Sequence, residues 1–201
     1  MMPNEYEHFF PASIVLETNR VELRLMQTAD IDALYKIAGA GDIWKYFNKD
    51  LSNKEEMRQW IETALNERAA EKRMPFVIID KGSNEICGST SFGNVSFYDK
   101  RVEIGWTWLG VESMGTGINH HAKFILLSYA FDTMQMERVE IKTDNLNTRA
   151  KQALIHIGAQ EEGVLRSHML MPDNRRRDSV YYSILKNEWE DVQMLYFSDM
   201  M

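Results

Sequence analysis

The chain has 201 residues and a formal net charge of −7, because 30 aspartates and glutamates outnumber 23 lysines and arginines. This length can bury one sizeable core, and we expect a single domain over residues 1–201. The acidic balance disfavours a nucleic-acid partner and suits a cationic one. Hydrophobic residues make up 44% of the chain and only four residues are proline, which excludes a disordered or fibrous protein.

Cys87 is the only cysteine, so an intrachain disulfide and a cysteine-based zinc site are excluded. We expect no metal cofactor and a reducing, cytoplasmic location. The N-terminal residues lack the basic flank and continuous apolar core of a signal peptide. No stretch approaches the ~18 apolar residues that a membrane span needs, so no membrane partner is expected.

The first third of the chain predicts one strand and two helices. Val21–Met26 alternates apolar and polar residues like a half-buried strand, and an amphipathic helix follows it. Ser52 and Glu55 form a capping-box pattern at the start of a second helix. We expect this helix to end near Arg73 and Pro75.

The middle third predicts a hairpin and a third strand. The segments FVIID and EICGSTSFGNVSF read as two strands, joined by a turn at Lys81–Asn84. The next segment, VEIGWTWLG, alternates strictly. Period-2 geometry then predicts two faces, one with Val102, Ile104, Trp106 and Trp108, the other with Glu103, Gly105, Thr107 and Leu109.

The last part predicts helix, strand, helix, strand, strand. A long apolar helix begins near Ile118, the strand Arg138–Asp144 follows, and Asn147 can cap the next helix. Two strand candidates then flank Arg175–Arg177, which we interpret as a solvated loop because Asp173 and Asp178 bracket it. The element order predicts a mixed α/β sheet with a crossover through the helix that begins near Ile118.

Met114-Gly115-Thr116-Gly117 lies between a strand that ends at Gly110 and the helix that begins near Ile118. Such a turn presents unpaired N–H groups and the positive end of the helix dipole, which suit a pyrophosphate. The alternative is a purely structural turn. The spacing matches neither the dinucleotide fingerprint nor a P-loop.

Several segments in this order resemble the GNAT superfamily of N-acetyltransferases, and within it the ribosomal-protein-alanine N-acetyltransferase-like branch. The resemblance covers nearly the whole chain through LETNRVELRLMQTADIDALY, EIGWTWLG, GTGINHHAK, KTDNLNTRAKQALIHIGAQEEGVLR and RRRDSVYYSIL. It implies a central, largely antiparallel sheet of six or seven strands, with helices on both faces and one splayed strand pair. It also implies acetyl-CoA as the donor.

The resemblance assigns the cofactor-binding positions. Leu109 and Val111 are candidates to line the pantetheine slot, and Asn147 is either a ligand and a cap or a cap alone. Met114 stands where the family usually has glutamine or arginine, while the backbone amides remain. The pyrophosphate positions are Met114, Gly115, Thr116, Gly117, Ile118 and Asn119.

Glu103 is our first candidate for the base that takes a proton from the attacking amine, and the alternative is a solvent-facing strand residue. Many relatives carry a serine or tyrosine acid at the positions of Ala150 and Leu154 here. Tyr181, Tyr182 or water could protonate the departing thiolate instead. Cys87 has no visible partner base, which favours direct attack over a covalent intermediate.

The favoured acceptor is a protein N-terminal amine. At pH 7, deprotonating an α-amino group costs about 1.2 kcal/mol and deprotonating a lysine about 4.6 kcal/mol. A small amine, such as an antibiotic or polyamine, and a non-catalytic acyl-CoA-binding module are the alternatives. Either a monomer or a homodimer is compatible with the sequence.

Overall fold

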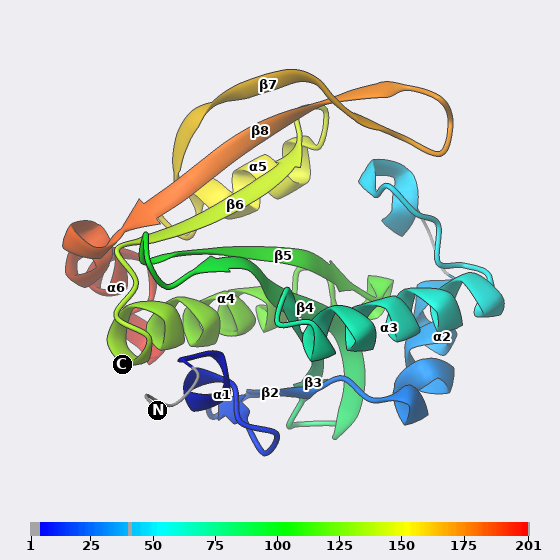
Figure 1. Cartoon of the computed structure of the whole chain (residues 1–201), viewed down its shortest axis with the longest axis horizontal. Coiled ribbons are helices and arrows are strands. Elements are labelled where there is room, and N and C mark those ends of the chain that lie inside the picture. The colour runs from blue at the N-terminus through cyan, green and yellow to red at the C-terminus, as the bar shows by residue number, and fades with distance from the viewer. Residues whose placement is uncertain (1–4, 40–41, 201) are drawn as a thin grey trace.

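The computed structural model describes residues 5–39 and 42–200, and over these residues one eight-stranded sheet forms the centre of the molecule (Figure 1). The strand order across the sheet is β1-β2-β3-β4-β5-β6-β8-β7. The strands are β1 Val15–Glu17, β2 Val21–Leu25, β3 Arg73–Asp80, β4 Glu85–Ser96, β5 Arg101–Leu109, β6 Arg138–Asp144, β7 Gln160–Leu170 and β8 Arg176–Leu185.

The sheet is largely antiparallel, as expected. Only β5 and β6 run parallel, because the chain crosses from one to the other through a helix. The strand number of six or seven was too low, since Val15–Glu17 adds an edge strand. Three residues are too short to show alternation in a sequence.

Helices cover both faces of the sheet, which confirms the expected fold class. On one face α1, α4, α5 and α6 pack on a main core that includes Phe92, Ile104 and Leu126. On the other face α2 and α3 pack on a second core that includes Trp44, Val77 and Trp108. The helices are α1 Glu5–Phe9, α2 Ile31–Ala38, α3 Lys54–Ala69, α4 Ile118–Ser128, α5 Thr148–Ile155 and α6 Trp189–Tyr196.

The limits of α3 differ from the prediction. Asn53, not Ser52, is the N-cap, and its side chain accepts hydrogen bonds from the backbone of Glu55 and Glu56. The helix ends at Ala69, and Pro75 lies inside β3. The Pro75 carbonyl accepts a hydrogen bond from the Met26 N–H, just beyond the last residue pair of β2 with β3. Because the strand pairing has ended there, the missing N–H of Pro75 removes no hydrogen bond between the two strands.

The strict alternation predicted for β5 is wrong beyond Gly105. The register against β4 shifts there, and Trp106 takes a left-handed φ of 52°, so one extra residue forms a bulge. Ile104 and Leu109 therefore both face the main core, whereas Trp108 faces the second core. None of the helices in the described part of the chain has the length and apolar content needed to cross a bilayer.

Candidate active site

The site lies where β5 and β6 separate. The two strands pair only over Arg101–Glu103 and Arg138–Glu140, and then diverge (Figure 1). From Ile104 to Leu109, β5 has no strand partner on that side. This confirms the splayed strand pair and leaves backbone N–H and C=O groups of β5 available to a ligand.

The glycine turn follows the end of β5. Gly115 and Gly117 adopt φ values of +76° and +90°, which glycine reaches without steric cost. The Thr116 hydroxyl donates to the Ser113 carbonyl at 2.8 Å and closes the turn. Within the described chain, the N–H groups of Gly115, Thr116 and Gly117 donate to no protein acceptor.

The turn leaves room for an anionic group. A Cβ built on Gly115 would meet no atom within 4 Å, and one built on Gly117 would meet only Arg20 Nη1 at 3.4 Å. The turn is exposed and leads directly into α4, whose N-terminal dipole favours an anion.

Two arginines beside this turn were missed in the sequence. Arg20 approaches Gly117, and Arg149 Nη2 lies 2.6 Å from Met114 Sδ. Arg149 thus brings a cation to Met114, where the family usually has glutamine or arginine. Arg149 could have been predicted near the turn, because it lies two residues after the candidate ligand Asn147. Arg20 lies nearly a hundred residues before the turn, and nothing in the sequence indicates that the two meet.

The flanking cofactor candidates take different roles. Asn147 caps α5, because its Oδ1 accepts from Ala150 N at 3.0 Å, and its role as a ligand stays a prediction. The side chains of Leu109 and Ile118 are buried in the main core, so only their backbones are available to a ligand. Val111 is 41% exposed, and Asn119 is half-buried.

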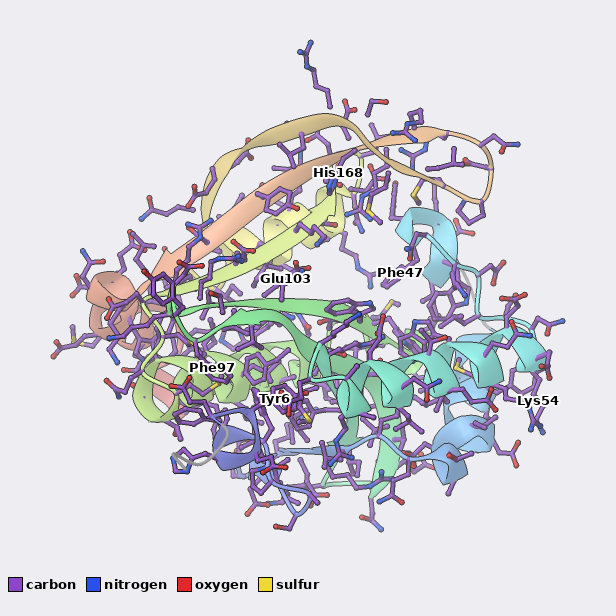
Figure 2. The ribbon with its side chains drawn as sticks, viewed as in Figure 1. Tyr6, Phe47, Lys54, Phe97, Glu103 and His168 are labelled. Atoms are coloured by element: carbon purple, nitrogen blue, oxygen red, sulfur yellow. The ribbon has the colours of Figure 1, made fainter. Side chains whose placement is uncertain are left out.

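Glu103 is the last β5 residue paired with β6 and is only 4% exposed, so the solvent-facing interpretation is wrong. Lys142 Nζ donates to both of its carboxylate oxygens, at 2.8 and 2.7 Å, and Asn94 Nδ2 donates to Oε2 at 2.8 Å. Figure 2 shows Glu103 between β5 and β6, with His168 on the β7 side and Phe47 across from it.

Tyr181 shares this environment. Lys142 Nζ lies 5.8 Å from the centre of its half-buried ring, and the His168 ring lies 6.0 Å away. The Tyr181 hydroxyl donates to no acceptor in the described chain, so it is available to a substrate. Lys142 therefore links the two predicted catalytic residues, Glu103 and Tyr181.

Tyr182 faces the other side of β8 and is 1% exposed. Its hydroxyl donates to Glu161 at 2.9 Å, and burial together with that carboxylate raises its pKa to about 12. It therefore packs in the main core and stays neutral. Leu154, at the position of the family's tyrosine acid, is also a main-core residue.

Cys87 is buried, and its thiol donates to the Ile78 carbonyl at 3.2 Å. Burial raises the pKa of this thiol to about 11, which is unsuitable for a nucleophile. In the part of the chain that the structure describes, no three histidine, cysteine, aspartate or glutamate side chains group as metal ligands would.

Arg73 was also missed, since the sequence placed it at a helix end. It is 2% exposed, and its guanidinium lies 4.9 Å from the Trp60 ring and 4.5 Å from the Trp106 ring. Nε donates to Ser91 at 2.9 Å, and burial lowers the pKa of Arg73 to about 10. This stack holds Trp106 in place at the bulge.

Lys123 gave no sequence signal. It lies on α4 and is 4% exposed, and among the described residues it donates only to Thr107 Oγ1, at 2.9 Å. Thr107 is the second residue of the bulge and shares a hydrogen bond of 2.8 Å with Thr90. Burial lowers the pKa of Lys123 to about 7.

Comparison with known proteins agrees with this geometry. A family model described as an acetyltransferase (GNAT) domain matches residues 20–160. The chain is 31% identical to an uncharacterized N-acetyltransferase p20 from Bacillus licheniformis, over 87% of this chain and 97% of the relative. It is 26% identical to a putative ribosomal N-acetyltransferase YdaF from Bacillus subtilis, over 85% and 93% of the two chains.

A solved structure extends the likeness in fold. Mycobacterium smegmatis RimJ in complex with CoA-disulfide superposes with a TM-score of 0.78 at 23% identity, over 93% of this chain and 95% of that one. The forked strands, the glycine turn and the family match lead to one assignment: the chain belongs to the GNAT acetyltransferases and is an acetyl-transferring enzyme.

Proposed function

We propose that the protein transfers the acetyl group of acetyl-CoA to the N-terminal amine of a protein or peptide by direct attack. One observation carries this proposal: the unpaired part of β5 begins at a buried carboxylate, Glu103, and leads to the exposed glycine turn that follows the strand. Its relative YdaF, a putative ribosomal N-acetyltransferase, supports a protein acceptor.

Acetyl-CoA supplies an activated thioester when bound, and the chain's residues do the rest. The amides of Gly115, Thr116 and Gly117 would hold the pyrophosphate, with Arg20 and Arg149 adding positive charge. The unpaired β5 backbone beyond Glu103 would accept the pantetheine arm. N–H groups there would also stabilise a developing oxyanion, an effect usually worth ~3 to 4 kcal/mol per donor.

Glu103 would take the proton that the amine loses as its nitrogen bonds to the acyl carbon and the carbon–sulfur bond breaks. Tyr181 would give a proton to the leaving thiolate, because its hydroxyl is free and lies on the same polar face. An α-amino acceptor suits this arrangement, since it needs about 3 kcal/mol less than lysine to lose its proton at pH 7.

The single sheet supports one domain over the whole chain, and the lone buried thiol suits a reducing cytoplasm. The enzyme interpretation is favoured over a non-catalytic binding module because Tyr181 can replace the acid missing at Ala150 and Leu154.

Calorimetric titration with acetyl-CoA tests the donor site. Native protein should bind, and Gly117→Glu should not, because a carboxylate in the turn repels the pyrophosphate. Tyr98→Glu is the matched control: it adds the same charge at a side chain that is 97% exposed, in the turn before β5 and at the opposite end of that strand.

Release of free thiol, measured with an alanine-initiated peptide and with spermidine, tests the acceptor. We expect turnover on the peptide amine. Binding of acetyl-CoA without turnover on any amine would replace the enzyme by a binding module, and faster turnover on spermidine would favour the small-amine alternative.

A further inference from the structure

The three consecutive arginines have three different environments, which corrects the expected solvated loop. Arg175 lies just before β8 and donates to the buried Asp144 carboxylate at 2.5 Å. Arg176 is exposed, and its Nε donates to Ser167 Oγ at 3.0 Å. Arg177 is only 8% exposed. A basic run in a sequence does not reveal which of its members is buried.

Arg177 lies on the same face of the sheet as the proposed catalytic residues. Alternate residues of β8 share a face, so Arg177, Ser179 and Tyr181 point to one side. Tyr181 contacts Lys142, which holds Glu103. The side chain of Arg177 also approaches Tyr46, in the short 3-10 turn after α2.

Among the described residues of this polar face, one cation has no ion pair of its own. Lys142 is paired with Glu103, and Arg175 is paired with Asp144. Arg177 is paired with no carboxylate among the described residues. Its one hydrogen bond, from Nη1 to the Tyr46 carbonyl, is long at 3.4 Å.

The Nε of Arg177 is buried and has no acceptor in the described chain. A buried guanidinium with an unmet donor is costly, because it has lost water without gaining an equivalent partner. Burial lowers its pKa, while the nearby Asp144 carboxylate, which is already paired with Arg175, acts in the opposite direction. An anion from outside the chain would satisfy both the charge and the free donor.

We propose that Arg177 binds a carboxylate of the acceptor substrate and so makes the enzyme selective for amines that also carry a carboxylate. This inference rests on the proposed acetyl transfer. In the proposed function the cofactor phosphates would lie at the glycine turn with Arg20 and Arg149. The carboxylate is either the acceptor's C-terminus or an acidic side chain near its amine, and both fit a guanidinium edge.

Paired acceptors that differ only in one carboxylate test this inference. Ala-Ala and its C-terminal amide test the terminal carboxylate, Ala-Glu-Ala-amide and Ala-Gln-Ala-amide test the side chain, and spermidine carries no carboxylate. Thiol release gives kcat/KM for each acceptor with native protein, Arg177→Gln, Arg177→Lys and Arg176→Gln. Arg176 is the matched control, since it is exposed and bonded to β7.

Native protein should favour the acid member of at least one pair by about 10-fold to 100-fold in kcat/KM, the usual value of a hydrogen bond to a charged group. Arg177→Gln should lose that preference, so that the acid and amide members react alike, while the KM for acetyl-CoA stays unchanged. Arg177→Lys should retain part of it, and Arg176→Gln all of it.

Equal native rates on both members of each pair overturn the inference, and this comparison does not depend on the folding of any variant. A rise in the KM for acetyl-CoA in Arg177→Gln also overturns it, since the arginine then serves the donor. If acetyl-CoA binds but no acceptor reacts, the proposed function itself fails, and the inference fails with it.

Discussion

Replacing Lys123 by methionine should stabilise the protein at neutral pH and do so less at alkaline pH. Lys123 is 4% exposed, and within the part of the chain that the structure describes its ammonium has one hydroxyl partner and no carboxylate partner. Burial lowers its pKa from 10.5 to about 7. Methionine has a similar length and no charge to desolvate. The Thr107 hydroxyl keeps Thr90 as a partner.

The sign follows from proton binding. Between about pH 7 and 10.5 the unfolded lysine holds a proton that the folded one has lost, so stability rises with pH. Each pKa unit is worth about 1.4 kcal/mol, so the full penalty is roughly 5 kcal/mol below pH 7. About 4 kcal/mol remains at pH 7 and about 2 kcal/mol at pH 9.

Urea unfolding of native protein and Lys123→Met at pH 7 and pH 9 measures this penalty. The difference in unfolding free energy between the two proteins should shrink by about 2 kcal/mol from pH 7 to pH 9. The exposed Lys72→Met serves as the control and should show no such change. A difference for Lys123→Met that is the same at both pH values would refute the reasoning.

Three further changes test the site. Gly93→Ala places a Cβ 2.4 Å from the Trp106 ring, so the ring must move off the Arg73 guanidinium. We expect the free energy of unfolding, measured with urea, to fall by about 1 to 3 kcal/mol. Unchanged stability would contradict the stack. Glu103→Gln should lower kcat by about 100-fold or more, and an unaltered kcat would remove Glu103 as the base. Arg149→Gln should weaken acetyl-CoA binding several-fold at low salt and less at high salt, as exposed charges are screened, and calorimetry that shows no salt dependence would argue against a phosphate contact.

Local patterns predicted much of the fold. The strand Arg138–Asp144, the Asn147 cap and the glycine turn all came from residues within a few positions of one another, where periodicity and backbone preferences operate. The splayed strands and the cofactor positions came from the family resemblance.

The rest depended on long-range contacts. Arg177 meets Tyr46 across 131 residues, and Lys142 meets Glu103 across 39. The bulge at Trp106 lies inside a segment whose sequence alternates strictly between apolar and polar positions. One extra residue in β5 moves the later side chains to the opposite face of the sheet, and the sequence carries no sign of it. A buried cation such as Lys123 also gives no local sign of its burial.

The short pairing of β5 with β6 gives Glu103 a second consequence. The sheet consists of two blocks, β1–β5 and β6–β8, which share a seam of three residue pairs. Glu103 stands at the open end of that seam, and its ion pair with Lys142 fastens one block to the other. The carboxylate proposed to accept the proton thus also fixes the angle of the fork that receives the donor. A substitution of Glu103 therefore changes the geometry of the fork together with the proposed proton transfer.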